Sequence, residues 1–281
     1  MLGSAVRSYL NRFGVAPGAR AVVFTASDDG WATARDLAAC GVAVAAVVDP
    51  RAKGIEKQGA RPWPVFAGAV VKEARGGQQL KSVIVRDDKG VETEIACDLL
   101  VVSNGWNPTL HLTCHLGGKP VWQESLAAFV PGSKPKGMDV AGAAAGHLSL
   151  AEAIHAGARL GAEAASGLRF TASVSPMPPV GGESSAVATP HWWVHGGKGA
   201  AFVDLQNDVT TKDIELARLE GYGASEHVKR YTTLGMGTDQ GKTANVVALG
   251  VLSELTGAPI PALGTTGFRP PYTPVTWGAL A

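Results

Sequence analysis

Residues 21–49 read AVVFTASDDGWATARDLAACGVAVAAVVD, and this stretch decides the fold class. Two apolar runs, Ala21–Thr25 and Val42–Val48, have the length and the β-branched content of buried strands. Between them, the apolar residues of Trp31–Cys40 recur at helical spacing. The second strand ends at Asp49, about 20 residues after the loop, which is the outline of a dinucleotide-binding half. We therefore predict an α/β fold.

The loop between the first strand and the helix lacks the glycine fingerprint of nucleotide-binding proteins. Thr25–Gly30 reads TASDDG where G-x-G-x-x-G would bring the backbone against a pyrophosphate. Asp28 and Asp29 would repel a phosphate there, and we interpret them as caps of the helix. We expect this site to be empty and Asp49 to be a weak candidate for a ribose ligand.

Composition limits the classes of partner. The chain has 281 residues, of which 46% are hydrophobic and 17% charged, and its net charge is +1. This length is enough for two modest domains. The small net charge predicts that neither nucleic acid nor a membrane is a partner. Its three cysteines, Cys40, Cys97 and Cys114, are widely separated and indicate neither a metal site nor a disulfide framework. We expect a reducing, cytoplasmic setting.

The remaining N-terminal half predicts one helix and a small set of strands. Met1–Phe13 carries apolar residues at helical spacing and Gly14 would end that helix. Val65–Lys72, Lys81–Arg86 and Glu92–Ala96 predict an antiparallel meander. A further strand begins at Cys97 and runs into a glycine and proline break, which resembles the crossover of flavoprotein reductases with two dinucleotide domains.

A second glycine-containing turn follows. Met138–Gly146 predicts a strand and a tight loop, and Ser149–Ala165 a helix. The residues expected to face inward on that helix are Leu150, Ala153, Ile154, Gly157 and Leu160. Flavoprotein reductases carry an Asp at the position of Ala143, where it binds the ribityl chain of FAD, so the resemblance argues against FAD here. A close strand–helix packing loop without a ligand is the alternative.

The C-terminal part begins with a linker, Arg169–Pro190, rich in Pro, Gly and Ser. Trp192 and Trp193 beside two histidines fit no zinc spacing and are interpreted as docking surface. A strand at Ala201–Asp204 and three short helices are then expected. Their predicted starts are Thr210 or Thr211, Ser225 and Lys242, and Gly257 would end the third.

The loop before the third helix has the composition of an anion site. Glu226–Asn245 reads EHVKRYTTLGMGTDQGKTAN, in which Arg230 and Lys242 add charge and the glycines would let a phosphate approach. Unpaired backbone N–H groups at a helix start would complete such a site. An ordinary capped surface helix is the alternative interpretation.

Three motifs carry a family resemblance: FVDLQNDVT (Phe202–Thr210), KRYTTLGMGTDQGK (Lys229–Lys242) and GTTGFRPPYTPV (Gly264–Val275). They resemble the alpha subunits of heterotetrameric sarcosine oxidases, over nearly the whole chain. In related opine and amine dehydrogenase subunits the loop carries cysteines that hold an iron–sulfur cluster. Asp239 and Ala244 stand at those positions here. The resemblance thus implies a small helical domain like the bacterioferritin-associated ferredoxin, without its cluster.

The resemblance also implies cofactors and partners. NAD would contact the turn at Met138–Gly146 and the start of the helix that follows it. FMN, shared with a beta subunit, would contact the loop at Glu226–Asn245. The beta subunit would carry FAD and FMN, and gamma and delta subunits would complete the enzyme. The implied NAD-binding residues are Gly142, Ala143, Leu148 and Leu150. The implied FMN-binding residues are Arg230, Thr233, Gln240, Gly241, Lys242 and Thr243. No residue is assigned to catalysis or to a metal.

The activity implied is the oxidative demethylation of sarcosine, with oxygen as acceptor and one-carbon transfer to tetrahydrofolate. We expect this chain to be part of such an oxidoreductase and to be inactive alone. A subunit of a related opine, proline or amine dehydrogenase, or a truncated non-functional product, are the alternatives. DNA flanking the reading frame would discriminate between them.

The expected fold is a partial two-dinucleotide-binding fold followed by the small helical domain. The first nucleotide-binding part and a folate-binding domain are expected to lie outside the chain, before Met1 and after Ala281. The predicted domains are 1–16 with 97–170, a remnant of the first dinucleotide-binding domain; 17–96, an inserted second one; 171–197, a linker; 198–264, the helical domain; and 265–281, an extended lead-in to the folate-binding domain.

Overall fold

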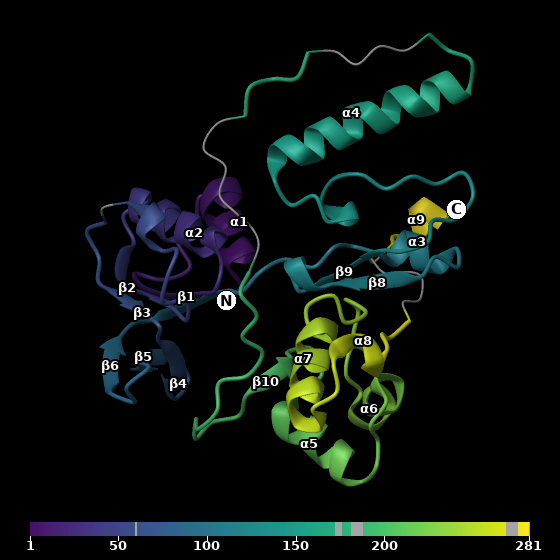
Figure 1. Cartoon of the computed structure of the whole chain (residues 1–281). Helices are drawn as coiled ribbons and strands as arrows, with labels where there is room; N and C mark the ends of the chain where they lie inside the picture. The colour runs from purple at the N-terminus through teal and green to yellow at the C-terminus, as the bar shows by residue number, and fades with distance from the viewer. Residues whose placement is uncertain (60, 172–175, 181–187, 268–274, 281) are drawn as a thin grey trace. The chain divides into compact units, whose positions relative to one another are not determined.

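The chain folds into two compact units (Figure 1). The computed structural model describes residues 1–59, 61–171, 176–180, 188–267 and 275–280. The first unit comprises Met1–Trp106 and Ser184–Gly199, and the second comprises Asn107–Glu183 and Ala200–Ala281. The finer division predicted from the sequence, with boundaries at residues 16, 96 and 170, stays a prediction.

The first unit is built on a four-stranded parallel sheet. Its strands are β1 (Arg20–Thr25), β2 (Ala43–Asp49), β3 (Val65–Ala67) and β7 (Leu99–Ser103), in the order β3-β2-β1-β7. Helices α1 (Gly3–Phe13) and α2 (Asp28–Ala39) lie on one side of it, and a small antiparallel sheet lies on the other (Figure 1). A short 3₁₀ turn, η1 (Glu56–Gln58), precedes β3. Both faces are covered, as the continuous apolar runs predicted.

Successive residues of β1 enter two separate cores. Val23 packs with Trp31 of α2 and Leu10 of α1, whereas Val22 packs with Val83 and Val85 of the antiparallel sheet. This division follows from the alternation of side chains across a strand. The predicted strand, helix and strand of residues 21–49 are confirmed.

The predicted meander is only partly correct. β4 (Val70–Gly76), β5 (Leu80–Arg86) and β6 (Glu92–Ala96) form an antiparallel sheet, but the predicted single strand at residues 65–72 is divided. Gly68 has a φ of +65°, which turns the chain so that β3 joins the parallel sheet and β4 joins the meander. Glycine adopts this left-handed backbone without steric cost.

Helix α1 is confirmed, and it packs with the parallel sheet. Gly14 ends it in a left-handed conformation and donates its N–H to the Leu10 carbonyl. The helix contacts α2 and β7, and Val6 is fully buried in the resulting core. The structure therefore groups α1 and β7 with residues 17–96.

Part of the predicted linker packs onto the first unit. The N–H of Thr189 donates to the carbonyl of Ala26, and Val194 packs against the core under β1 and β5. Trp192 and Trp193 are half-buried, and the Trp193 ring lies 4.0 Å from that of His195. The two tryptophans are thus partly used inside this unit. Residues 172–175 and 181–187 of the linker lie outside the described residues.

In the first unit, side chains of this chain occupy the loop at Thr25–Gly30, where a nucleotide-binding protein would hold a phosphate. Gly30 lies so close to Thr25 that a Cβ on it would come within 2.2 Å of the Thr25 Oγ1. Asp28 and Asp29 do not cap α2 as predicted; Ser27 is the N-cap residue. Asp28 pairs instead with Arg51 at 2.9 Å, and Asp29 with Arg7 at 3.2 Å.

Asp49, the weak candidate for a ribose ligand, has a structural role in this unit. Its side chain is 0% exposed and accepts hydrogen bonds from Trp31 Nε1 at 2.9 Å and from Arg51 Nη2 at 2.8 Å. The Asp49 carboxylate raises the pKa of Arg51 above its ordinary value, mainly through these side-chain hydrogen bonds, and Asp28 adds to the effect. A buried carboxylate needs such partners because its desolvation is costly.

The second unit contains a β-hairpin, a long helix and a helical cluster. Its strands are β8 (Pro120–Gln123), β9 (Ala128–Pro131), β10 (Phe202–Asp204) and β11 (Val209–Thr210). Its α-helices are α3 (His111–His115), α4 (Leu150–Gly167), α5 (Thr211–Leu219), α6 (Ser225–Thr232), α7 (Asn245–Thr256), α8 (Ile260–Leu263) and α9 (Trp277–Leu280). Short 3₁₀ turns are η2 (Glu124–Leu126) and η3 (Gly142–Ala145).

Two predictions are corrected, one about the segment before α4 and one about α4 itself. The expected strand at residues 138–141 is irregular backbone, because no described segment pairs with it and a strand needs a partner for its N–H and C=O groups. On α4 itself, Ala153, Ile154 and Leu160 are half-buried, whereas Leu150 and Gly157 are exposed. The helix packs mainly on η3.

The helical cluster begins as predicted at Thr210. Its side chain and that of Asp213 form a capping box at the start of α5. The third predicted helix begins three residues late, at Asn245 rather than Lys242, and ends at Gly257 as expected. Of the proline-rich segment predicted to be extended, Trp277–Leu280 is helical and residues 268–274 lie outside the described residues.

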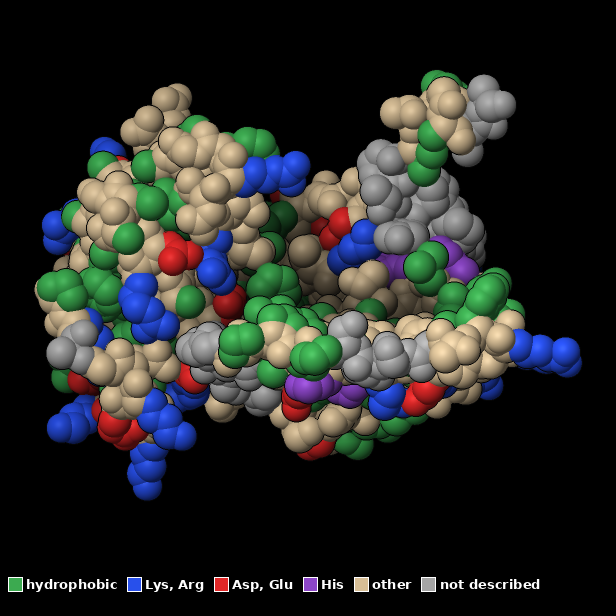
Figure 2. Space-filling model, turned by 90° about the horizontal axis from the view of Figure 1, so that it is seen from above, with side chains coloured by type: hydrophobic (Ala, Val, Ile, Leu, Met, Phe, Trp, Pro, Cys, Tyr) green, Lys and Arg blue, Asp and Glu red, His purple; other side chains and the backbone are tan. Residues whose placement is uncertain are grey.

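The described helices include none that is long and apolar enough to cross a bilayer. On the face shown in Figure 2, Lys and Arg side chains are dispersed among Asp and Glu rather than gathered into one patch. In the antiparallel sheet, for example, Lys72 pairs with Glu92, and Arg75 pairs with Glu73 and Glu94.

Replacing Arg51 should destabilise the first unit strongly. Arg51→Ala leaves the buried Asp49 carboxylate without its cation, and we expect the free energy of unfolding to fall by about 2–4 kcal/mol. Arg35→Ala, which removes an exposed arginine bonded to Gln58, is the matched control with an expected cost below about 0.5 kcal/mol. Urea unfolding measures both, and equal costs would contradict the prediction.

Asp98 should make stability depend on acid pH. The N–H groups of Ala19 and Arg20 donate to its carboxylate, and these bonds lower the pKa of Asp98 below its ordinary 3.8. The stabilisation is therefore present above pH 3.8 and is lost as the pH falls through the lower folded-state pKa. Asp98→Ala should cost about 1 kcal/mol at neutral pH, and this difference should shrink in acid.

Unfolding curves of the two proteins at neutral pH and in acid test this. Asp88→Ala, in the exposed turn between β5 and β6, is the control. A cost for Asp98→Ala that does not change with pH would show that the carboxylate charge is unimportant.

Candidate functional site

The loop between α6 and α7 is held by a buried carboxylate from β10. One oxygen of Asp204 accepts the N–H of Gly235 at 2.7 Å, and the other accepts the N–H of Gln206 at 2.8 Å. Asp204 is buried at 2% exposure. These bonds attach the loop to β10, which precedes it by some thirty residues in the sequence. Such a contact forms only in the folded protein.

The rest of the FVDLQNDVT motif continues this support. The Gln206 Oε1 accepts from the Thr238 N–H at 2.8 Å, and the Asn207 amide donates to the Thr233 carbonyl at 3.1 Å. Gly237 leaves room for Gln206, since a Cβ there would lie 2.3 Å from the Gln206 Oε1. Hydrogen bonds therefore connect the motif at Phe202–Thr210 to the motif at Lys229–Lys242, and the first supports the loop that the second forms.

Asn245, at the start of α7, organises the inner side of the loop. It is 7% exposed, and its amide donates to Thr266 Oγ1 at 2.8 Å. A Cβ on Gly235 or Gly241 would lie 2.4 or 2.1 Å from its Oδ1. Both glycines also have positive φ, +65° and +74°. We predicted that glycines here admit a phosphate, but these two make room for Asn245.

Asp239 accepts hydrogen bonds from N–H groups that we expected to bind a phosphate. One of its oxygens accepts the Gly241 N–H at 2.9 Å, and the other accepts the N–H and the hydroxyl of Thr243 at 3.3 and 2.9 Å. The backbone N–H groups of Gly241 and Thr243 are therefore used by the chain's own carboxylate. Asp239 is thus a carboxylate that binds donors of its own loop.

The other predicted FMN contacts differ in exposure. Arg230 is 68% exposed on α6, and its Nε lies 3.9 Å from Glu226. Thr233 is exposed and Gln240 half-buried, and both have positive φ, +64° and +53°. Lys242 is half-buried in the turn before α7. Arg230 and Thr233 thus face solvent on the outside of the loop.

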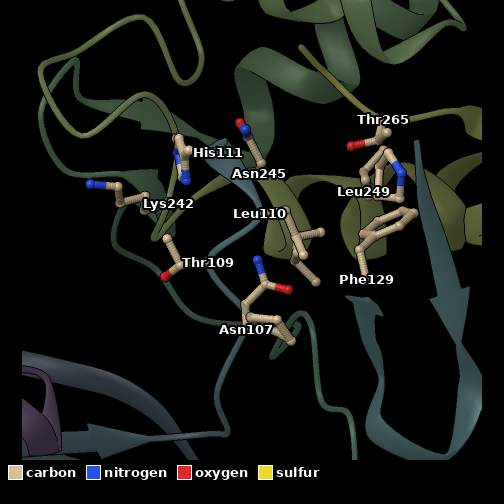
Figure 3. Close-up of a pocket in the computed structure, with 13 residues that line it drawn as sticks. Asn107, Thr109, Leu110, His111, Phe129, Lys242, Asn245, Leu249 and Thr265 are labelled. Carbon is tan, nitrogen blue, oxygen red and sulfur yellow. The ribbon is translucent and has the colours of Figure 1, made fainter. Parts of the chain in front are cut away.

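A pocket in the second unit lies on the inner side of this loop (Figure 3). Lys242 and Gly241 are the predicted residues that contribute to it, and Arg230 is not among the described lining residues. The pocket is lined by Asn107, Pro108, Thr109, Leu110, His111, Pro120, Phe129, Gly241, Lys242, Asn245, Val246, Leu249 and Thr265. Sequence reasoning missed Asn107, Thr109 and His111, because no local motif links that segment to the loop.

His111 is the most perturbed group in the pocket. It is 2% exposed, and its pKa is lowered to about 4 by burial and then by the positive charges of Lys242 and His115, against a smaller opposite effect of Asp239. The imidazole is therefore neutral at physiological pH. The His111 and His115 rings, one turn apart on α3, lie 6.4 Å apart, edge to face.

The predicted NAD-binding residues gather at the start of α4. Gly142, with a φ of +63°, begins η3 and its carbonyl accepts the N–H of His147. Ala143 and Leu150 are exposed and Leu148 is half-buried. Gly142 and Ala143 lie in η3, Leu148 lies in the irregular segment after it, and Leu150 begins α4. Ser149 already caps that helix by accepting the Glu152 N–H at 3.2 Å.

Metal ligation finds no support in the part of the chain that the structure describes, where no three His, Cys, Asp or Glu side chains come together to hold an ion.

Comparison with known proteins gives consistent matches. Residues 198–281 match the family model of the sarcosine oxidase A3 domain. The whole chain is 44% identical to the sarcosine oxidase subunit alpha of Rhizobium meliloti, covering 28% of that protein, and 38% identical to that of Corynebacterium sp. strain P-1, covering 31%. The chain thus spans less than a third of the length of these curated relatives.

A solved structure supports the fold. The L-proline dehydrogenase of P. horikoshii matches all of this chain with a TM-score of 0.73 at 19% identity, over 54% of its own length. At that identity the match shows the fold alone, an α/β oxidoreductase-type fold with a helical region. The sequence matches identify the relationship: along its whole length the chain is homologous to part of the sarcosine oxidase alpha subunit, and residues 198–281 match the A3 domain.

Proposed function

We propose that this chain forms part of the alpha subunit of a multi-subunit sarcosine oxidase and supplies cofactor-binding surfaces to it. The observation that carries the proposal is the support of the loop at residues 233–243, which is hydrogen-bonded to Asp204, Gln206 and Asn245. Such support goes beyond what a surface loop needs. Thr233 at the start of the loop and Arg230 on the preceding helix α6 are both exposed. The similarity to sarcosine oxidase alpha subunits supports the assignment.

The loop and the end of α6 are proposed to contact FMN shared with a beta subunit that also carries FAD. Arg230 can hold a phosphate through two parallel hydrogen bonds, and Lys242 adds a point charge. Thr233 and Gln240 can contribute side-chain hydrogen bonds. Gly241 and Thr243 shape the turn, since Asp239 accepts from their N–H groups.

The turn at residues 142–150 is proposed as the NAD contact. Gly142 allows a close approach of the backbone, and Leu148 and Leu150 offer apolar surface to a ring. Ser149 occupies the helix cap, so we assign binding to the turn and to these side chains rather than to free N–H groups of α4.

The reaction itself belongs to the whole enzyme. We infer oxidative demethylation of sarcosine in the cytoplasm, with oxygen as acceptor and tetrahydrofolate receiving the one-carbon unit. Beta, gamma and delta subunits would be the partners. We assign no catalytic residue to this chain, and we expect it to be inactive without the beta subunit.

Removing the two cations should release the flavin. We expect the chain co-purified with a flavin-bearing beta subunit to show FMN absorbance. Arg230→Ala with Lys242→Ala should lose most of it, because both proposed phosphate-binding cations are removed. Arg218→Ala with Lys212→Ala, two exposed cations of α5, is the matched control. A double variant that retains full FMN would overturn the proposed contact.

Disrupting the scaffold should weaken flavin retention without touching the cations. Asn245→Ala removes the bond to Thr266 and leaves a gap beside two glycines, so we expect a stability loss of about 1–2 kcal/mol and a lower flavin content. Ser253→Ala, at the far end of α7, should cost stability through its bond to Ala258 but leave flavin content unchanged. Flavin absorbance per chain and urea unfolding distinguish the two effects.

A further inference from the structure

The pocket behind the loop has an apolar wall and directs no charge inward. Phe129 and Leu249 lie on one side of it, and His111 and Lys242 lie on the other (Figure 3). Both His111 and Lys242 have interactions within the protein, and the amino group of Lys242 points away from the rest of the lining. His111 is neutral at physiological pH, because burial lowers its pKa to about 4. The lining therefore favours an uncharged ligand.

The apolar share of the lining is large, and its amide is already engaged. The Asn245 side chain donates to Thr266 Oγ1 at 2.8 Å and to the Gln240 carbonyl at 3.4 Å, so both of its N–H bonds are used inside the protein. The apolar lining residues are Pro108, Leu110, Pro120, Phe129, Val246 and Leu249. An apolar solute gains by moving from water against such a wall.

The size of the pocket limits the ligand to very few atoms. Its cavity volume is about 40 Å³, which corresponds to on the order of three water molecules. A flavin or nicotinamide ring does not fit this space, whereas a molecule of two or three non-hydrogen atoms does. Dioxygen is uncharged, apolar and diatomic, and so meets the requirements of both the lining and the volume.

We propose that this pocket binds dioxygen and holds it next to the loop that contacts FMN. Gly241 and Lys242 belong both to the lining of the pocket and to that loop, so the two sites adjoin. The inference rests on the proposed function, from which it takes oxygen as the electron acceptor. It adds the place at which this chain receives that acceptor.

The first test follows the methyl signals of the isolated full chain by NMR while dioxygen replaces nitrogen above the solution. Dioxygen is paramagnetic and speeds the relaxation of the protons that it contacts. Leu249 lines the pocket and is 3% exposed, and Leu99, at 4% exposure in the core of the first unit, is the matched control. Relaxation of the Leu249 methyl groups should increase about fourfold more than that of Leu99, because dioxygen is enriched in the pocket. Equal increases would overturn the proposal.

Filling the pocket should abolish this effect. Val246→Phe adds a ring at a lining residue, and we expect it to lower the response of Leu249 to that of Leu99. Val247→Phe is the control, because Val247 is also half-buried on α7 but is not among the described lining residues. Urea unfolding checks that both variants fold, and Val246→Leu, which adds one methylene group, replaces Val246→Phe if the ring prevents folding. A folded pocket variant with an undiminished Leu249 response would refute the site.

The second test uses the enzyme assembled with its flavin-bearing beta subunit. We expect Val246→Phe to raise the KM for dioxygen about fourfold in sarcosine oxidation and to leave turnover unchanged when ferricyanide replaces dioxygen. An unchanged KM for dioxygen would refute the role of the pocket in supplying the acceptor. Failure of the wild-type assembly to oxidise sarcosine would refute the proposed function instead, and the methyl relaxation of the chain alone distinguishes these two failures.

Discussion

Buried carboxylates that accept hydrogen bonds from their own chain are the constraint on which both units depend. Asp49 in the first unit receives Trp31 and Arg51, and Asp204 in the second receives the backbone of Gly235 and Gln206. Each is almost inaccessible to water. A carboxylate so placed is tolerated only with its donors in place, so each one fixes the loops that supply those donors.

Carboxylates bonded within the chain also explain the two loops that resemble phosphate-binding loops. Sequences with glycine turns at helix starts commonly leave N–H groups for an external phosphate. In this chain Asp239 takes those of Gly241 and Thr243, and Asp28 with Arg51 fills the corresponding loop of the first unit. Both loops resemble anion-binding loops in sequence, but a carboxylate of the chain itself stands where an external anion would bind. Cofactor contacts are therefore proposed on the side chains that remain outside.

Particular residues show how far the sequence could be interpreted. Gly14 and Gly257 end their helices as expected, because a left-handed residue after a helix is a local requirement that glycine meets. The strand expected at residues 138–141 failed, because a strand depends on a partner elsewhere. Asn107 and His111 could not have been joined to Lys242, since they come together only when the chain folds back.

The sequence by itself determined the α/β character of residues 21–49, the helix ends and the family relationship, since these rest on local periodicity, capping and motif identity. Tertiary structure alone decided that Gly235 and Gly241 make room for Asn245, that Asp239 is an internal anion, and that His111 is neutral in a pocket. The physical reason is that a glycine, a carboxylate or an imidazole has several possible partners. Packing and desolvation select one of them, and both arise only between segments distant in sequence.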